Sequence, residues 1–232
     1  MKILALDTTL GACSASVAVG ESGGPALFSV FERREREHAE VIMVMIEKVM
    51  GDAGLAFGAL DAIAATVGPG SFTGVRVGVA AARGLALATG HPLIGVTSLE
   101  VMAHLALERL EETPGTLAIA VDARRGEVYQ ALFTGAGETI SPPAALTPEQ
   151  AAMQLPETGT LFIAGGGAQL VARAAPAVGR KTKAVLPDLQ PEAAKLAEMA
   201  LTRRPISGPL HPLYLRAPDA KPQAGKSVPR RH

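Results

Sequence analysis

The apolar and polar positions along the chain predict three opening strands, followed by helices and strands in alternation. The short apolar runs at residues 3–6 and 62–67 are typical of strands that are covered on both faces. The runs at 14–19 and 26–31 are joined by a turn rich in glycine, serine and proline, which predicts an antiparallel hairpin. Helices are predicted over 38–50, 73–89 and 98–110, with another buried strand that ends at Val96.

The second half of the chain predicts a repetition of this order. A buried strand at 117–121 ends in Asp122, as the strand at 3–6 ends in Asp7. The other elements predicted here are a strand over 127–133, a helix capped by Thr147 with Pro148 at its first position, a strand over 161–164 and a closing helix over 191–203. The repetition predicts an α/β protein with the two-lobed actin-like (ribonuclease H-like, ASKHA) fold, in which duplicated mixed sheets are flanked by helices.

The predicted elements divide the chain into two lobes and a tail. We expect residues 1–97 to form an N-terminal ribonuclease H-like lobe and residues 98–216 a second, degenerate lobe, whose closing helix is able to pack back on the first. Residues 217–232 have almost no apolar content, which predicts a disordered tail.

An actin-like fold raises the question of a nucleotide site between the lobes. Such a site needs glycine turns around the phosphates and a carboxylate that organises a metal ion. The vestigial candidates for these roles are Asp7, Gly165, Gly166 and Gly167. An aspartate that ends a strand more often caps a turn, and residues 68–74 lack the lysine of a phosphate-binding loop. An ATP-binding or ATP-hydrolysing enzyme is therefore kept only as an alternative, and we expect no cofactor.

Composition narrows the classes of function. The 232 residues carry 22 basic and 22 acidic side chains, and this zero net charge gives no electrostatic reason for the free chain to bind nucleic acid or membranes. The single Cys13 excludes an intrachain disulfide, and the five histidines show no metal-ligand spacing. The opening segment does not read as a signal peptide, so we expect a cytoplasmic protein.

Two of the predicted helices have unusual surfaces. In the helix over 38–50, Met43, Val44 and Met50 lie off the main apolar stripe, so the helix is either a well-covered core element or packs its surplus face on a partner protein. In the helix over 73–89 a small residue recurs every fourth position, at Gly74, Gly78, Ala82 and Ala86. This spacing predicts a shallow groove that another backbone could approach closely.

Five motifs together closely resemble the TsaB (YeaZ) family of bacterial proteins. They are Ile3-Leu-Ala-Leu-Asp7-Thr-Thr, Glu37-His-Ala-Glu40, Gly68-Pro-Gly-Ser-Phe-Thr-Gly-Val-Arg-Val-Gly78, Asp122-Ala-Arg-Arg-Gly-Glu-Val-Tyr129 and Pro212-Leu-Tyr-Leu-Arg216. The resemblance implies a noncatalytic subunit of the machinery that makes threonylcarbamoyladenosine at position 37 of tRNA. It implies a catalytic TsaD-like partner, a TsaE-like ATPase, a homodimer when the catalytic partner is absent, contact with tRNA only within the complex, and no membrane association.

The same resemblance implies that the metal chemistry of the catalytic paralogue has been lost. In that paralogue two histidines one helical turn apart, in a motif of the form Asn-His-Leu-Glu-Gly-His, hold the metal. The matching segment here has Ser98 and Met102 at those positions. A hydroxyl and a thioether cannot replace two imidazoles for a hard or borderline divalent ion. We therefore expect no metal and no catalytic residue.

The resemblance and the two helix surfaces together predict a four-helix interface with the partner. Its expected residues are His38, Val41, Ile42, Met45, Gly74, Val75, Arg76, Gly78, Val79 and Ala82. A bulky residue at Gly78 is then expected to release the partner while the monomer stays folded. The competing hypothesis is that this protein's own helices fill the groove.

Two further hypotheses stay open. One is a protease that acts on its partner, although the chain offers no nucleophile, base and orienting group in a recognisable set. The other is direct contact with tRNA phosphates in the assembled complex, through Arg124, Arg125 and the tail residues Lys221, Lys226, Arg230 and Arg231.

Overall fold

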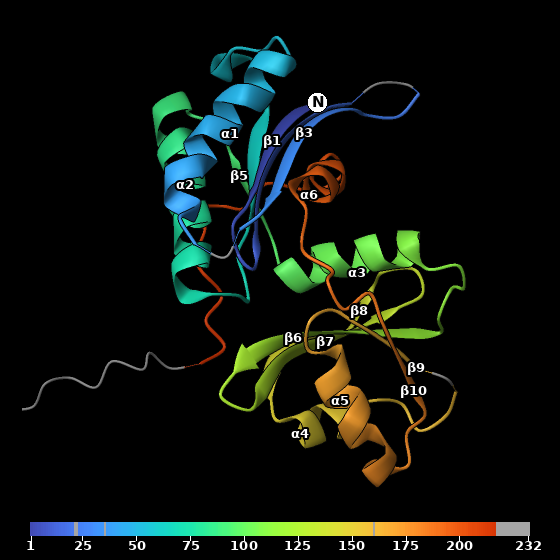
Figure 1. Ribbon diagram of the computed structural model, residues 1–232. Coiled ribbons are helices and arrows are strands. Elements are labelled where there is room, and N and C mark those ends of the chain that lie inside the picture. The colour runs from blue at the N-terminus through green and yellow to red at the C-terminus, as the bar shows by residue number, and fades with distance from the viewer. Residues whose placement is uncertain (21–22, 35, 160, 217–232) are drawn as a thin grey trace, which may run out of the picture.

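The computed structural model describes residues 1–20, 23–34, 36–159 and 161–216, which form two mixed sheets with helices around them (Figure 1). The first sheet consists of β1 (Lys2–Asp7), β2 (Ala12–Val19), β3 (Ala26–Arg33), β4 (Ala62–Thr66) and β5 (Leu93–Val96). Its strand order is β3-β2-β1-β4-β5, with β1 antiparallel to β2 and parallel to β4. The predicted hairpin is confirmed, because β2 and β3 pair antiparallel along their whole length.

The second sheet repeats this arrangement. It consists of β6 (Thr116–Arg124), β7 (Glu127–Thr134), β8 (Thr139–Leu146), β9 (Leu161–Ala164) and β10 (Thr182–Val185). Its order is β10-β9-β6-β7-β8, with β6 antiparallel to β7 and parallel to β9. The duplicated mixed sheets confirm the predicted actin-like fold class.

The helices and sheets alternate in five layers. The helices are α1 (His38–Asp52), α2 (Phe72–Thr89), α3 (Ser98–Arg109), α4 (Pro148–Met153), α5 (Ala168–Ala174) and α6 (Ala193–Ala200), with short 3-10 turns at Phe57–Ala59 and Ala175–Val178. In Figure 1, α1 and α2 cover one face of the first sheet, α6 and α3 lie between the sheets, and α4 and α5 cover the outer face of the second. Three apolar cores fill the spaces between these layers.

Side-chain caps begin three of the helices. The hydroxyl oxygens of Ser71 and Thr97 accept hydrogen bonds from backbone N–H groups in the first turns of α2 and α3. The predicted cap at Thr147 is confirmed as a complete capping box with Gln150. These caps fix where α2 and α3 begin, and both helices begin beside the junction of the two lobes.

The last described residues, 193–216, pack on the first sheet, although they follow the second lobe in the sequence. Helix α6 packs on β1 and β2, and Leu210 is buried in the core under α1 and α2. The backbone N–H groups of Ile206 and Leu213 donate hydrogen bonds to the carbonyls of Leu93, in β5, and Val67, just after β4, at 2.9 and 2.7 Å. The closing helix packs back on the first lobe, as the sequence allowed, and the division at 98–216 changes accordingly: residues 193–216 complete the first lobe. The tail predicted over 217–232 lies outside the described residues.

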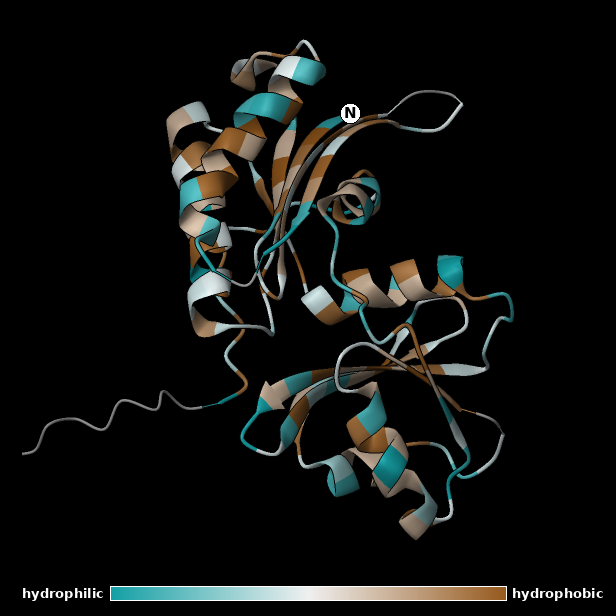
Figure 2. Cartoon of the chain, in the orientation of Figure 1, coloured by the Kyte–Doolittle hydropathy of each residue, from teal (hydrophilic) through white to brown (hydrophobic). Residues whose placement is uncertain are grey.

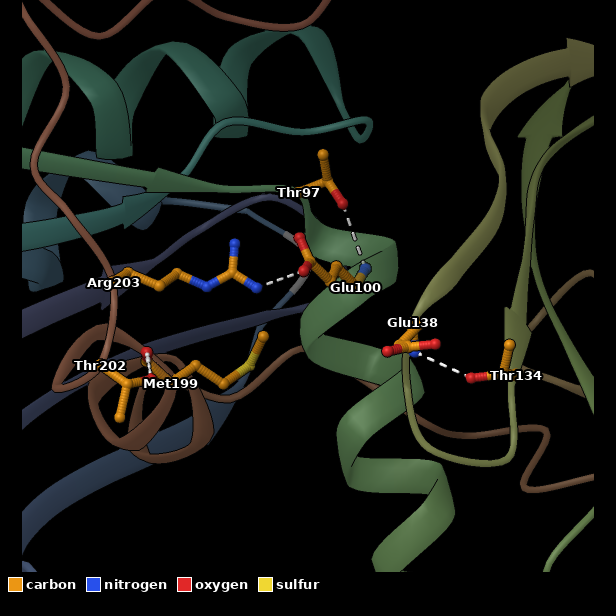
Figure 3. A network of polar contacts seen from close by, with 7 residues as sticks. All are labelled: Thr97, Glu100, Thr134, Glu138, Met199, Thr202 and Arg203. Carbon is orange, nitrogen blue, oxygen red and sulfur yellow. Dashed lines mark hydrogen bonds and ion pairs between the residues drawn. The ribbon is translucent and has the colours of Figure 1, made fainter.

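Polar contacts join α3 to the chain that follows α6 (Figure 3). Thr97 accepts a hydrogen bond from the backbone N–H of Glu100 at 3.2 Å, and the carboxylate of Glu100 pairs with the guanidinium of Arg203. Two more ion pairs join α3 to α6 itself: Glu108 pairs with Lys195 in α6, and Arg109 pairs with Glu192, the residue that precedes α6. The two middle helices are thus connected along their length.

Figure 2 shows how apolar residues are distributed through these layers: the central strands of the first sheet are largely brown, and teal residues recur on the helices that cover them. Among the residues that the structure describes, no helix has both the length and the apolar content that a bilayer-spanning helix needs.

Candidate functional site

A cleft of about 550 Å³ lies where the two lobes meet. Loops from both lobes line it, because the carboxyl ends of β1, β4, β6 and β9 all point towards the junction. Its lining residues are Leu10, Gly11, Gly70, Ser71, Phe72, Val121, Asp122, Ala123, Arg124, Arg125, Tyr129, Gly166, Leu189, Gln190 and Arg216. Three arginines and one aspartate make the charged part of this lining basic.

Asp7, the candidate metal carboxylate, does not line the cleft. Its side chain is fully buried, and its Oδ1 accepts hydrogen bonds from the hydroxyls of Thr66 and Thr9 at 2.5 and 2.7 Å. Its Oδ2 has no hydrogen-bond partner among the described residues. Burial raises the pKa of this carboxyl from its ordinary 3.8 to about 6, against the smaller opposing effect of the hydroxyl donors. A carboxyl in this setting holds the strand end together and is poorly placed to bind a metal ion in the cleft.

The raised pKa of Asp7 predicts a pH-dependent loss of stability. The folded state binds the proton more tightly than the unfolded state, so this group lowers the free energy of unfolding as pH rises from about 4 to about 6. A difference of about two pH units corresponds to about 3 kcal/mol. We expect Asp7→Asn to unfold at higher urea concentration than the wild type at pH 7.5 and to lose the advantage at pH 4.

The control for this prediction is Asp61→Asn, at an exposed carboxylate that accepts a hydrogen bond from the backbone N–H of Lys2. We expect this variant to follow the wild type at both pH values, because an exposed charge loses little solvation. An Asp7→Asn protein that is less stable than the wild type at pH 7.5 would contradict the raised pKa of Asp7 in the folded state.

The three glycines after β9 have mainly a packing role. A Cβ atom on Gly165 would lie 2.5 Å from the carbonyl oxygen of Ala120, and one on Gly167 would lie 2.9 Å from the carbonyl carbon of Val121. These two glycines allow the turn to cross β6 closely. Of the three, only Gly166 is exposed and lines the cleft. The structure thus brings one of the four nucleotide candidates to the cleft.

The turn between β6 and β7 presents two arginines to the cleft in an unusual backbone conformation. Arg124, Arg125 and Gly126 have φ values of 65°, 57° and 78°, in the left-handed region that non-glycine residues rarely adopt. The Oδ1 of Asp122 accepts a hydrogen bond from the backbone N–H of Arg124 at 2.7 Å, which stabilises the turn. This backbone conformation is unfavourable for an arginine, and it places both arginines at the opening of the cleft.

Arg216 holds this turn from the other lobe. Its guanidinium donates to the carbonyls of Ala123 and Arg124 at 2.9 and 3.1 Å and pairs with the carboxylate of Glu127. Its guanidinium carbon also lies over the ring of Tyr129, 5.8 Å from the ring centroid. The last arginine of the Pro212-Leu-Tyr-Leu-Arg216 motif therefore positions the arginine turn of the second lobe.

Ser98 and Met102, which stand at the metal-ligand positions of the paralogue, are both fully buried. The hydroxyl of Ser98 donates a hydrogen bond to the carbonyl of Pro69 at 2.5 Å. Met102 lies in the core between the sheets, where its methyl group would touch a Cβ atom on Gly165 at 3.1 Å. Among the described residues, no three His, Cys, Asp or Glu side chains gather in a way that could hold a metal ion. These donors do not fit a metal site of the paralogue's kind.

Most of the residues predicted at the partner interface face the core of their own lobe, so that part of the prediction is corrected. Helical spacing identifies an apolar face, but it does not reveal that the same chain covers it. Val41 is half-buried and Arg76 is exposed. The buried residues are His38, Ile42, Met45, Gly74, Val75, Gly78, Val79 and Ala82.

The small-residue groove of α2 is filled by the end of β1. Cβ atoms on Gly74 and Gly78 would lie 2.1 Å from the carbonyl oxygen and 2.6 Å from the hydroxyl oxygen of Thr8. That hydroxyl donates a hydrogen bond to the carbonyl of Gly74 at 2.6 Å. The competing hypothesis was correct that the chain itself fills the groove, but a strand end occupies it rather than a helix.

The outer faces of α1 and α2 carry a different set of apolar residues. Met43 and Val44 are exposed on α1, as the surplus-face hypothesis allowed, whereas Met50 is buried. Val44 exposes 63% of its surface, and Leu87 on α2 exposes 89%. The exposed charges also differ between the helices: α1 carries Glu40, Glu47 and the ion pair of Lys48 with Asp52, whereas α2 carries Arg76 and Arg83.

A cluster that the sequence did not reveal lies beside α2. The guanidinium carbon of Arg76 is 3.5 Å from the ring centroid of Phe72, and its Nε donates to the hydroxyl of Tyr214 at 2.6 Å. The two rings lie 5.7 Å apart and expose 52% and 47% of their residues' surfaces. In the sequence, the two aromatic residues were marked only by their positions within two of the five family motifs.

Comparison with known proteins identifies relatives along most of the chain. A family profile described as "TsaD: tRNA N6-adenosine threonylcarbamoyltransferase" matches residues 30–186. The tRNA threonylcarbamoyladenosine biosynthesis protein TsaB of Escherichia coli is 41% identical over 57% of this chain, and the match spans only 55% of that protein's length. An uncharacterised protein of Mycobacterium tuberculosis is 32% identical over 96% of this chain and 95% of its own.

A solved structure is similar over almost its whole length. It is a crystal structure of an uncharacterised Pseudomonas aeruginosa protein with similarity to the peptidase YEAZ. It has a TM-score of 0.81 and 32% sequence identity, and it covers 93% of this chain and 99% of its own. A second structure, of YeaZ from the same organism, has a TM-score of 0.71 at 32% identity.

Proposed function

The chain belongs to the TsaB (YeaZ) family, and from this premise we propose that it is a noncatalytic subunit of the complex that modifies tRNA to N6-threonylcarbamoyladenosine. In this proposal it forms a heterodimer with a TsaD-like catalytic subunit, to which a TsaE-like ATPase binds. It forms homodimers when the catalytic subunit is absent, and it reaches tRNA only within the complex.

The main support for the proposal is that Ser98 and Met102 are buried and make packing contacts. The hydroxyl of Ser98 is engaged by a backbone carbonyl, and the thioether of Met102 is packed in the core between the lobes. Two imidazoles at these positions would need both room and access to a ligand, and neither is available. These residues support a subunit that has kept the architecture of a transferase while using the former site for packing.

The outer faces of α1 and α2 support the expected partnership. Val44 and Leu87 expose apolar surface that nothing in the described chain covers, and such surface is stabilised by docking. Acidic residues dominate the exposed charges of α1, and arginines are the exposed charges of α2. A partner with a similar helix pair, either a paralogue or a second copy, can therefore place each helix against one of opposite charge.

The alternative activities find less support. A peptidase needs an accessible nucleophile, but Cys13 is fully buried, and burial raises the pKa of its thiol to about 12. An ATPase of this fold needs a carboxylate that faces the cleft, whereas Asp7 is enclosed by two threonine hydroxyls. Both hypotheses rank below the subunit proposal.

Reconstitution tests the proposal. The catalytic subunit, the ATPase, threonylcarbamoyl-adenylate and an unmodified tRNA are combined with or without this chain, and the modified nucleoside is measured by mass spectrometry. We expect omission of the chain to abolish modification, and we expect the chain alone to modify no tRNA. Equal modification with and without the chain would refute the proposal.

A further inference from the structure

The two sheets have four edge strands, and three of these edges are protected. An unprotected edge presents a row of unpaired N–H and C=O groups, which pair readily with another strand. The end of the described chain covers the open side of β5, where the backbone N–H of Ile206 donates to the carbonyl of Leu93. Pro142 and Pro143 interrupt the row of donors on β8, and β10 has only four residues.

The fourth edge, β3, has none of these protections (Figure 1). Its eight residues pair with β2 in an unbroken register and include neither proline nor lysine. Residues 23–31 carry no charged side chain, and Leu27 and Phe31 expose 37% and 41% of their surfaces. In the described part of the chain, no strand pairs with the side of β3 that faces away from β2. A long, uncharged and apolar edge of this kind is typical of a site where another strand adds to the sheet.

Both faces of β3 carry apolar side chains. Phe31 pairs with Ser14 of β2, whose hydroxyl accepts a hydrogen bond from the first backbone N–H of α6, so Phe31 and Leu27 lie on the α6 face. Phe28 and Val30 lie on the opposite face, against the core under α1 and α2. A strand added to this edge would therefore bury apolar surface on both faces of the sheet.

The apolar pattern of β3 is symmetric about Ser29, with two apolar residues on each side of it. If a two-fold axis passes through Ser29 at right angles to the sheet, Leu27 lies opposite Phe31 of a second copy, and Phe28 lies opposite Val30. This symmetry keeps each side chain on its own face, because residues directly opposite each other in an antiparallel pair point to the same side. Apolar residues then meet apolar residues at all of these positions.

Neighbouring registers fit less well. Moving the axis one residue towards the C-terminus would place the charged Arg33 opposite Leu27. Moving it one residue towards the N-terminus would place Phe31 opposite Pro25, which has no N–H to donate. The symmetric register leaves both charged residues of the strand, Glu32 and Arg33, outside the apolar pairs. The sequence of β3 is therefore complementary to itself in one register.

We propose that the outer side of β3 (Ala26–Arg33), which we call the β3 edge, pairs antiparallel with the β3 edge of a second copy of this chain, with the two-fold axis at Ser29. The pairing joins two five-stranded sheets into one continuous sheet. It is isologous, so each cross-strand contact occurs twice. The β3 edge borders the sheet, whereas α1 and α2 cover one of its faces, so this contact is separate from the helix surfaces of the proposed function and does not depend on it.

Cysteine cross-linking tests the inference on the full chain. In the symmetric register, two copies of a Ser29→Cys variant bring their Cβ atoms to about 4.5–5.5 Å, close to the separation that a disulfide needs. Cys13 is fully buried and does not compete. Every protein also carries Val44→Asp, so that docking through α1 does not contribute. After mild oxidation we expect a disulfide-linked dimer of Ser29→Cys and a monomer of Thr139→Cys, the control at an exposed position of the edge strand β8.

An exchange of charges tests the register. Added to the Ser29→Cys protein, Leu27→Lys with Phe31→Lys sets like charges opposite each other, and Leu27→Lys with Phe31→Glu sets opposite charges there. Within one chain these two positions are about 13 Å apart along the strand, so their charges interact little in the monomer. We expect the two lysines to slow cross-linking about tenfold and the lysine with glutamate to recover most of the rate. We expect equal unfolding midpoints in urea for the two proteins, because both positions are exposed.

A Ser29→Cys protein that cross-links no faster than the Thr139→Cys control would overturn the inference, and so would equal cross-linking of the two charge variants. The proposed function is judged separately, by co-elution with the catalytic subunit and by tRNA modification. Without Val44→Asp, we expect the variant Leu27→Lys with Phe31→Lys to retain both. Loss of the catalytic subunit by this variant, with an unchanged unfolding midpoint, would place the β3 edge in the partner interface and overturn its separation from α1 and α2.

Discussion

Replacement of Gly74 by alanine is expected to destabilise the first lobe by at least about 3 kcal/mol. The new Cβ atom would lie 2.1 Å from the carbonyl oxygen of Thr8 and 2.5 Å from the hydroxyl of Ser71, which caps α2. A shift of Thr8 would disturb the contact between the end of β1 and α2, and a shift of the Ser71 hydroxyl would break the cap of α2. Chemical denaturation followed by circular dichroism measures the change.

Gly84 in the same helix provides the matched control. It is exposed, and no described atom lies within 4 Å of the position of its Cβ. Gly84→Ala is expected to stabilise the protein by about 0.5–1 kcal/mol, because glycine is a poor helix former. If both alanine variants had the same stability, the close packing of Thr8 against α2 described above would be refuted. Gly78 also packs against Thr8, so we expect a Gly78→Leu variant to unfold. Such a variant would lose its partner because it is unfolded, and its behaviour would therefore not test the interface.

Replacement of Val44 by aspartate is expected to abolish co-elution with the catalytic partner, with an affinity loss of about tenfold to a hundredfold. Val44 is the more exposed of the two apolar residues on the outer face of α1, and a charge there would have to be desolvated beside apolar surface. The free energy of unfolding of the isolated chain should change by less than about 0.5 kcal/mol, because the side chain is on the surface. Size-exclusion chromatography and calorimetric titration with the partner measure the two effects.

Ile140→Asp is the control for the Val44 variant, because Ile140 is also a β-branched residue with about half of its surface exposed. It lies on β8 of the second lobe, away from α1 and α2. We expect it to keep its partner. An interface on the second lobe would give the opposite result: Ile140→Asp would lose the partner and Val44→Asp would keep it.

The sequence predicted the fold well where local pattern and tertiary structure agree. The strands at 3–6, 62–67 and 161–164 are buried on both faces, and their apolar runs match β1, β4 and β9 closely. Two edge strands were missed. β8 contains Pro142 and Pro143, which a pattern of strand formers penalises, and the sequence of β10, Thr182–Val185, is not a continuous apolar run like that of the equally short β9.

The candidate sites were harder to predict, because their residues meet only in three dimensions. The spacing of Gly74 and Gly78 revealed a close approach, but only the structure shows that Thr8 makes it. Asp7 ends a strand as predicted, yet the hydroxyls that enclose it include that of Thr66, 59 positions away. Phe72 and Tyr214 are 142 positions apart in the sequence and touch because the chain returns along the first sheet. Periodicity within one element carries no information about such pairs.

The return of residues 193–216 to the first sheet has a consequence for how the protein is made. A ribosome releases β1 to β5 long before α6, so the face of the first sheet that α6 covers stays exposed while the second lobe is synthesised. The second lobe has its own core with α4 and α5 and can collapse in that interval. We therefore expect nascent chains that end before residue 193 to bind chaperones through β1 and β2, and the late helix to release them.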